Sequence, residues 1–464
     1  MDDLGGAPAL RADGTPPVEG KGRTAEGLTP NAILDPVILR FAVLTYLVVL
    51  PVGQLFAIPF NGTTATGSDV FLALVLLAGL IELGRMSGPY FAGRVESLPL
   101  LPGRSAFHMA ALFSISFSIW VALGATWGSH PRYAMAKGLA FAALGLGALA
   151  ILWCGARWGR AADAWLLGTA VCLAVTWFGA LLGPEALQER VFYSGGSIRG
   201  LPMPRLSGPF PHPNMFGDYL VVSGAILWAR WGAVRDVLGW GAVVAAWLLT
   251  VTLLMTVSSA WLGAGVLLTG IGLITIRQRD GGLSLQWKRP APFLLVVAGI
   301  ILFTMTLSAL VLPMGVEVAG LSITGSGIRP SIWASALEAF KEAPIGGVGA
   351  SPFLAIAADP LDGTGVANSW DAHNVYLSIL AQFGLVGATL FAGAVLMPVR
   401  TLVREGTTRR HVVLVIAVLA VGAHGIAIAN EEFRHLWALL GLIALAGVPR
   451  WAQAQWWKEE GPQE

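Results

Sequence analysis

The sequence predicts an all-α polytopic membrane protein, and two observations predict it: the composition and the recurrence of long apolar runs. Of the 464 residues, 55% are hydrophobic and only 12% are charged, and the mean hydropathy is +0.69. Soluble domains carry about 25% charged residues, so this composition excludes a soluble enzyme. The formal net charge of +2 is too small for the basic field of a nucleic-acid-binding protein, and we expect no nucleic-acid partner.

The apolar runs are about 17 to 24 residues long, enough for a helix to cross a hydrocarbon core of about 30 Å. They predict about twelve transmembrane helices. These lie near residues 37–58, 68–84, 106–127, 135–156, 164–183, 213–230, 237–256, 259–276, 291–313, 374–398, 411–429 and 435–449.

The two ends of the chain have a different composition. Residues 1–34 are rich in Gly, Pro, Thr and charged residues without an apolar run, so we expect a disordered cytoplasmic tail rather than a signal peptide. Residues 35–449 form the predicted single transmembrane domain, and residues 450–464 form a second cytoplasmic tail. Of the 29 Lys and Arg residues, 21 fall on one side of the predicted helices. Because positive residues favour the cytoplasmic side, we expect both termini there.

Two outer segments are long, residues 184–212 and residues 314–373, and the second connects predicted helices nine and ten. Long ordered loops in compact proteins are commonly functional. Apolar residues at helical spacing between Pro330 and Pro344 predict an amphipathic helix on the outer surface. They are Ile332, Trp333, Ala336, Leu337 and Phe340.

Arg329 precedes the proline that starts this predicted helix. Its guanidinium would therefore lie beside the positive end of a helix, where an anion such as a phosphate binds well. Arg is also the side chain suited to bidentate contact with oxyanions. The structural alternative is that Arg329 extends to the interface or pairs with Glu338 or Asp371, and position alone favours neither interpretation.

His373 lies where the long outer segment re-enters the membrane. A histidine at a helix N-terminus is favoured in its neutral form, which can accept a proton as a general base. Taken alone, a capping or interfacial histidine is the more common case. Asp371 or Asn374 could cap the helix, and Asp371 could instead orient the imidazole ring.

The motif LPMPRLSGPFPHPNMFGDYL places four polar residues around the outer end of predicted helix six. They are Arg205, His212, Asn214 and Asp218. An acidic residue inside a membrane helix is costly and therefore a functional candidate by default. Asp218 lies only about 6 Å inside the helix, so solvation by water or by Arg205 is the structural alternative.

Other polar residues in or near the helices show no spacing that suggests a proton relay, which leaves a proton-coupled transporter unsupported. They are Asp69, Glu82, His108, Lys137, Asp163, His424, Glu431 and Glu432. No two acidic residues stand two apart, so the acid-x-acid motif that holds a divalent metal is absent from the sequence. Cys154 and Cys172 both lie in apolar runs. We therefore expect no metal site and no cofactor.

Two motifs together resemble the O-antigen ligase and O-antigen polymerase superfamily. The first is RPSIWASALEAFKEAPIGGVGASPF, which begins at Arg329 and is followed by AHNVYLSILAQFGLVG. The second is GPFPHPNMFGDYL. The resemblance covers roughly residues 205 to 395, and the motifs are fairly specific as a set.

The resemblance implies a GT-C type membrane fold and a metal-independent, inverting glycosyltransferase at the outer face of the bacterial inner membrane. Such enzymes move a glycan from undecaprenyl pyrophosphate to an acceptor hydroxyl. The acceptor would be a second lipid-linked glycan for a polymerase, lipid A core for a ligase, or a protein for an O-oligosaccharyltransferase. Arg329 matches the family arginine that binds the donor pyrophosphate, and His373 matches the histidine proposed to activate the acceptor.

One position departs from the family pattern. Members usually carry a Ser-Arg pair at the start of the helix that here begins TVSSAWLGAG, and this chain has Ser258 and Ser259 instead. A second phosphate-binding arginine would have to come from elsewhere, and Arg205, Arg199 and Arg434 are the candidates. A secondary transporter of a small anion and a non-catalytic polysaccharide-assembly protein stay open as alternative functions.

Overall fold

The computed structural model describes most of the chain from Pro36 to Val448, and every structural statement below concerns the described residues. These are residues 36–60, 63–91, 104–193, 197–198, 201–202, 205–280, 291–311, 316–318, 321–323, 329–351, 355–358, 367–370, 372–405 and 408–448. The predicted tails at residues 1–34 and 450–464 lie outside them. Residues Pro36–Glu464 form one compact unit.

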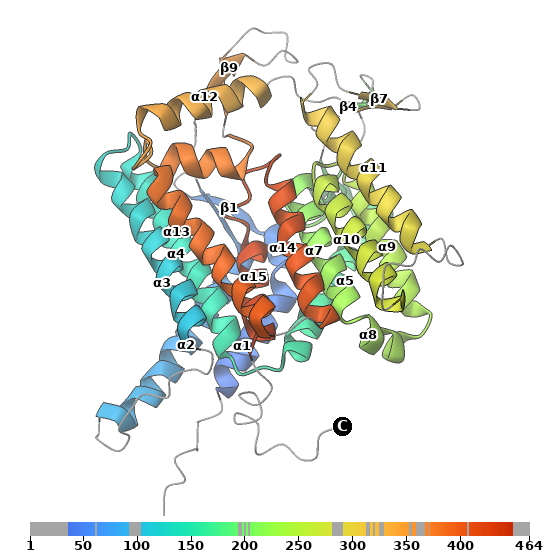
Figure 1. Cartoon of the computed structure of the whole chain (residues 1–464), viewed down its shortest axis with the longest axis horizontal. Helices are drawn as coiled ribbons and strands as arrows, with labels where there is room; N and C mark the ends of the chain where they lie inside the picture. The colour runs from blue at the N-terminus through green and yellow to red at the C-terminus, as the bar shows by residue number, and fades with distance from the viewer. Residues whose placement is uncertain are drawn as a thin grey trace, which may run out of the picture. The chain divides into compact units, whose positions relative to one another are not determined.

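Helices make up most of the described chain (Figure 1). They are α1 Val37–Val49, α2 Gly67–Phe91, α3 Arg104–Leu123, α4 Pro131–Trp153, α5 Trp158–Leu182, α6 Glu185–Val191, α7 Pro213–Ala229, α8 Trp231–Leu238, α9 Gly241–Met255, α10 Trp261–Asp280, α11 Ala291–Val311, α12 Arg329–Glu342, α13 Val375–Glu405, α14 Arg409–His424 and α15 Arg434–Ala446. Two short 3-10 turns, Val52–Leu55 and Gly124–Thr126, follow α1 and α3.

Short antiparallel hairpins occupy the connections. The strand pairs are β1 Ala57–Phe60 with β2 Thr63–Thr66, β3 Phe192–Tyr193 with β6 Arg205–Leu206, β4 Ser197–Ile198 with β5 Leu201–Pro202, β7 Val316–Val318 with β8 Leu321–Ile323, and β9 Ala355–Ala358 with β10 Ala367–Trp370. The register of the second pair sets Arg205 opposite Tyr193.

Each of the predicted apolar runs contains a helix, as expected for an all-α membrane protein. The run at 37–58 is helical only as α1, which ends at Val49, and continues as a 3-10 turn and the start of β1. Among the described residues, five helices are long and apolar enough to cross a membrane, and a sixth span results if the bent pair α8 and α9 is counted as one. The five are Gly67–Arg85, Met109–Thr126, Pro131–Trp153, Trp158–Leu182 and Val375–Arg404. Twelve crossings therefore stay a prediction, because several of the remaining apolar helices are shorter.

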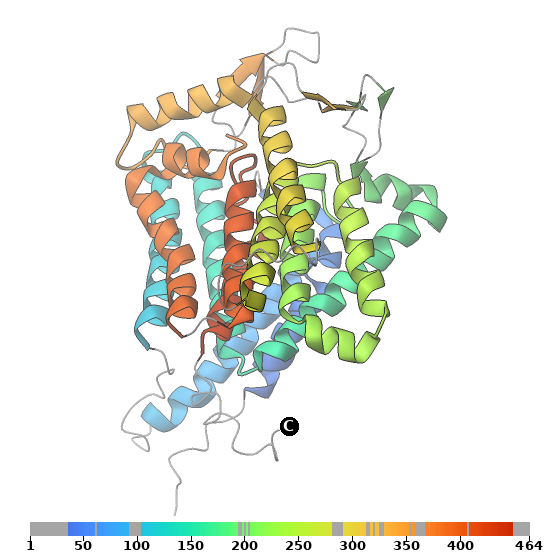
Figure 2. The same ribbon diagram turned by 45° about the vertical axis from the view of Figure 1, so that its right-hand side comes forward.

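Helices far apart in sequence pack side by side. Helix α13 packs on α3, α15 on α4, and α14 between α7 and α10 (Figures 1 and 2). Small residues allow close approach: a Cβ added at Gly265 of α10 would lie 2.7 Å from the carbonyl oxygen of Gly299 in α11. Such contacts are typical of helices that pack in a membrane.

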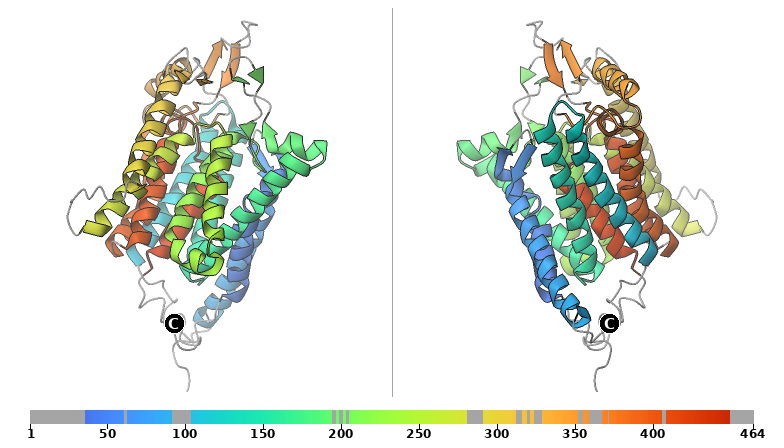
Figure 3. Two further views of the ribbon diagram at one scale, coloured as in Figure 1. Left: turned by 90° about the vertical axis from the view of Figure 1, so that its right-hand side faces the viewer. Right: turned by 90° about the vertical axis from the view of Figure 1, so that its left-hand side faces the viewer.

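Helix α12 lies across one end of the bundle, beside the β9–β10 hairpin (Figures 1 and 3). Ile332 and Ala336 are buried on its inner face, whereas Leu337 is exposed. The helix begins at Arg329 and ends before Pro344, because proline suits a first helical turn and stops the helix that precedes it.

The segment after α12 docks into a break in α13. At Gly384 the backbone has φ 63° and ψ −166°, which interrupts the helix. The amides of Leu385 and Val386 bond the carbonyls of Pro344 and Ile345, and the amide of Gly349 bonds the carbonyl of Gln382. A Cβ at Gly384 would lie 2.3 Å from the carbonyl oxygen of Ile345, so only glycine fits there. The break fixes α12 relative to the start of α13.

Candidate active site

The start of α13 presents His373 at the end of the bundle where α12 lies. The side-chain oxygen of Asn374 accepts hydrogen bonds from the amides of Tyr376 at 3.0 Å and Leu377 at 3.1 Å. Asn374 is thus the cap that the sequence offered as one of two choices. Asp371, the other choice, lies outside the described residues. His373 has φ 42°, a strained backbone for a residue other than glycine, and such strain is common at functional sites.

Arg205 is held by two partners from different parts of the chain. Its Nε donates to the carbonyl of Thr256 at 3.1 Å, and one terminal nitrogen donates to the side-chain oxygen of Asn214 at 3.2 Å. Its guanidinium carbon lies 5.9 Å from the centre of the Tyr193 ring. Burial lowers the pKa of Arg205, but an arginine stays charged in proteins. Arg205 is therefore a fixed, partly desolvated cation.

His212 precedes α7 as its N-terminal cap. Its Nδ1 accepts the amide of Asn214 at 3.1 Å, which requires a ring nitrogen without a proton. Burial, and after it the charge of Arg205, lowers the pKa of His212 from 6.5 to about 4. Smaller contributions in the same direction come from His373, His424 and Arg329. His212 is therefore neutral at neutral pH.

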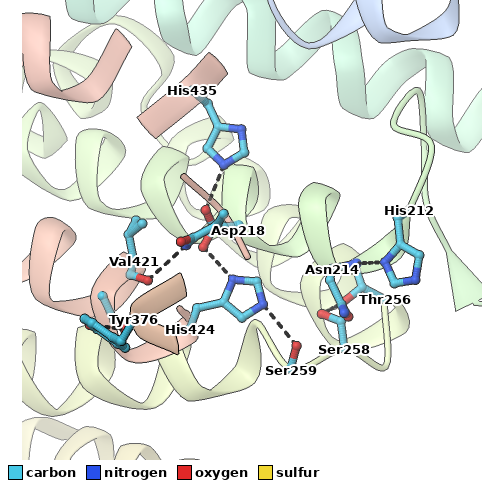
Figure 4. Close-up of polar contacts among 12 residues, drawn as sticks. His212, Asn214, Asp218, Thr256, Ser258, Ser259, Tyr376, Val421, His424 and His435 are labelled. Atoms are coloured by element: carbon cyan, nitrogen blue, oxygen red, sulfur yellow. Dashed lines mark hydrogen bonds and ion pairs between the residues drawn. The ribbon is translucent and has the colours of Figure 1, made fainter. Parts of the chain in front are cut away.

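Asp218 has partners other than those expected from the sequence. Both carboxylate oxygens contact histidines, Oδ1 with His424 Nδ1 at 2.6 Å and Oδ2 with His435 Nε2 at 2.8 Å. The other ring nitrogen of His424 lies 3.1 Å from Ser259 Oγ (Figure 4). Asp218 and His424 are completely buried. From the sequence, a pairing of Asp218 with Arg205 is the structural alternative. In the structure, Arg205 instead binds Thr256 and Asn214.

Sequence reasoning missed this cluster. His424 was seen only as one of several scattered polar residues, and His435 was not singled out. The available signal was position: Asp218 lies near the start of one helix, His424 ends another and His435 lies in the first turn of a third. If these helices alternate in direction, all three ends meet on the same side of the membrane.

The candidates for the missing family arginine differ in the residues that they contact. Arg205 bonds the loop that contains Ser258 and Ser259, through the carbonyl of Thr256. Arg434 instead forms a two-point ion pair with Asp69 at the start of α2. Arg199 lies outside the described residues. Arg205 is the only one of the two described candidates that contacts this loop.

Chemically, the arrangement suits an anionic ligand. Two arginines, Arg205 and Arg329, lie within electrostatic range of His212, which is itself uncharged. Arginines in a partly desolvated setting bind pyrophosphate oxygens strongly. His373 adds a group that can exchange protons in the same neighbourhood. In the described part of the chain, no group of three or more His, Cys, Asp or Glu residues is placed to hold a metal ion.

Comparison with known families finds a match over part of the chain. Residues 244–392 match the family model described as O-antigen ligase. The match runs from within α9 to within α13, and it includes Ser259, Arg329 and His373. No curated protein matches the chain. The match over residues 244–392 confirms the resemblance to the O-antigen ligase and polymerase family that the motifs indicate.

Proposed function

We propose that the protein is a polytopic glycosyltransferase of the bacterial inner membrane, with both termini cytoplasmic and a GT-C type architecture. It would move a glycan from undecaprenyl pyrophosphate to an acceptor hydroxyl at the outer face, without a metal. The observation that carries the proposal is that Arg205, a part-buried cation, is bonded to the carbonyl of Thr256 and to Asn214. It thereby lies beside the Ser258–Ser259 loop of the matched region, which also contains Arg329 and His373. The family match supports the same chemistry.

Arg329 and Arg205 bind the donor. The pyrophosphate gains negative charge as its bond to the anomeric carbon breaks, and fixed cations in a partly desolvated site stabilise that charge better than water does. Arg205 supplies the second cation in place of the family arginine, because it is bonded to the loop where that arginine would lie. The neutral His212 holds the amide of Asn214 and adds no charge.

His373 acts as general base. It takes the proton of the acceptor hydroxyl while the hydroxyl oxygen attacks the anomeric carbon and the pyrophosphate leaves with the bonding electrons. Because this is a single displacement, the anomeric configuration inverts. The backbone conformation of His373 and the helix cap at Asn374 fix the position from which the imidazole side chain extends. Asn214 and Asp218 support the site through Arg205 and His424 respectively.

The test is transfer by the purified protein with a polyprenyl-pyrophosphate glycan donor. Three acceptors, namely a second lipid-linked glycan, lipid A core and a protein hydroxyl, separate polymerase, ligase and O-oligosaccharyltransferase. We expect transfer to survive EDTA. We expect His373→Ala and Arg329→Ala each to lower it by about 10³-fold, the size of effect seen when one transition-state contact is removed.

The matched controls are His130→Ala and Arg132→Ala, since both residues are exposed at the start of α4. Each control should keep transfer near the wild-type rate. Full transfer by His373→Ala would overturn the assigned base. Uptake of a free anion into vesicles without any transfer would favour a transporter instead.

A further inference from the structure

The mechanism above leaves one buried cluster without a direct role. We call it the Ser259–His424 relay: Ser259, His424, Asp218 and His435, joined in that order by contacts of 3.1, 2.6 and 2.8 Å (Figure 4). Each of the four residues is at least nine-tenths buried. A carboxylate only accepts hydrogen bonds, so His424 donates from Nδ1 to Asp218. In the neutral ring with its proton on Nδ1, Nε2 is the nitrogen that accepts the hydroxyl of Ser259.

The relay joins four elements that are distant in sequence. Asp218 lies on α7, Ser259 precedes α10, His424 ends α14 and His435 lies in the first turn of α15. A fully satisfied buried network of this kind makes a structure rigid. His424 is its central member, because it contacts both Asp218 and Ser259.

On one side, His424 reaches the loop that holds Arg205. Ser259 Oγ bonds His424, and Thr256, three residues earlier, accepts the guanidinium of Arg205 through its carbonyl. Between them Val257 has φ 43°, a strained backbone for a β-branched residue. In this conformation the loop makes both contacts, with Arg205 at Thr256 and with His424 at Ser259.

On the other side, the residue after His424 holds the start of α13. The carbonyl of Gly425 accepts the amide of Val375 at 2.8 Å, two residues beyond His373. A second contact runs in parallel, from the hydroxyl of Tyr376 to the carbonyl of Gly422 at 2.8 Å. The end of α14 thus carries the segment from which His373 projects.

We infer that His424, oriented by Asp218, is a positioning residue that sets the spacing between the donor-binding Arg205 and the base His373. This inference rests on the proposed function. Transfer requires the base, the hydroxyl and the leaving pyrophosphate to be aligned, and a misplacement of about 1 Å costs about 100-fold in rate. The His424 side chain is bonded to the loop at Ser259, and the helix end that bears it holds the start of α13 through the backbone carbonyls of Gly422 and Gly425.

The experiment compares two histidines that bind the same carboxylate. His424→Ala should lower kcat by about 100-fold with the KM values for donor and acceptor changed less than about threefold, because groups are misaligned rather than removed. His435→Ala is the matched control, since it is buried and bonds Asp218 but bonds neither the Arg205 loop nor the start of α13 in the described contacts. It should lower the melting temperature and leave kcat within about threefold.

A gentler pair of variants covers the case in which His424→Ala does not fold. Ser259→Ala removes only the contact between His424 and the loop, and we expect kcat to fall by about tenfold. Ser258→Ala, which removes a contact to Thr256 Oγ1, should stay near the wild-type rate. Equal kcat losses for His424→Ala and His435→Ala, or wild-type kcat for Ser259→Ala, would overturn the positioning role.

Two further readouts separate this inference from its alternatives. If His373→Ala keeps full transfer, the proposed function fails; if His373→Ala is inactive and His424→Ala has wild-type kcat, only this inference fails. Ser259, His424 and Asp218 also have the order of a serine-hydrolase triad. Covalent labelling of Ser259 by a fluorophosphonate in the full-length protein would show a nucleophile and overturn the positioning role, whereas absence of labelling is the expected result.

Discussion

Two polar clusters include residues in or next to the loop between α14 and α15, and they differ in composition. In the first, Lys137 of α4 lies 2.6 Å from Glu432 and 3.6 Å from Glu431. In the second, Asp218 is shared between His424 and His435. The first contains a permanent cation and joins α4 to the loop. The second contains imidazoles and joins α7 to α14 and α15.

The contacts of the two clusters show which polar groups hold the bundle together and which reach the candidate site. The Lys137 cluster continues into α13 through Ser378, which donates to Glu431 at 3.0 Å, and Gln382. Its described contacts do not reach Arg205 or the loop at Ser259. The Asp218 cluster bonds that loop directly. We therefore expect the first cluster to govern stability and the second to govern stability and, through Asp218 and His424, also transfer.

Breaking the Lys137 cluster should have the largest effect on stability. Lys137→Met leaves Glu431 and Glu432 without their cation, and removal of one partner from a buried ion pair such as Lys137–Glu431 costs about 3 to 5 kcal/mol. Thermal unfolding in detergent measures the loss, with Arg132→Met on the exposed face of the same helix as control. Transfer per folded molecule should be unchanged. A loss below about 1 kcal/mol would show that this cluster does not hold the bundle.

Changing the second cluster should have a smaller effect on stability but a visible effect on transfer. Asp218→Asn keeps the shape and weakens two charge-assisted hydrogen bonds, which predicts a loss of about 2 to 3 kcal/mol and partial loss of transfer. Asp163→Asn is the control, because Asp163 forms an exposed pair with Arg230 worth less than about 1 kcal/mol. Wild-type transfer in Asp218→Asn would remove the distinction between the clusters.

The third prediction concerns His212, which lies outside both clusters, and the pH dependence of the free energy of unfolding. Its pKa is about 4 in the folded protein against 6.5 for the ordinary group, so between these values the unfolded chain binds more protons. Stability from this residue is therefore complete above pH 6.5, falls as the pH drops from 6.5 to 4, and levels off below 4. We expect this loss to be about 1 to 3 kcal/mol. The measurement is the free energy of unfolding as a function of pH, and His212→Gln should lose this pH-dependent part. The same pH dependence in the variant and the wild type would contradict the low pKa of His212.

The smallest effect is expected on the surface of α12. Lys341 and Glu338 form an exposed ion pair of 2.7 Å one turn apart. Pairs of this kind contribute about 0.2 to 0.5 kcal/mol, so Lys341→Met should shift the unfolding midpoint barely, and less in high salt. A shift comparable to that of Lys137→Met would mean that α12 depends on charges rather than on its buried Ile332 and Ala336.

The class of the protein and the location of its helices follow from the amino-acid sequence. A helix in an apolar environment satisfies its backbone internally, so apolar runs such as residues 213–230 read directly as helices, here α7. Local chemistry also determined the start of α12 next to Pro330 and the cap at Asn374. The motifs at Arg329 and His373 indicated the family before any fold was known.

The pairing of the polar residues, in contrast, depends on how the helices pack. Asp218 and His424 are 206 positions apart, Lys137 and Gln382 are 245 apart, and the break at Gly384 is filled by the segment after α12. Such contacts depend on which helices are neighbours and how each is rotated. A hydropathy pattern records only that a helix is apolar, because lipid and protein neighbours are equally apolar. The placement of Arg205 beside the loop at Ser259 follows from packing alone.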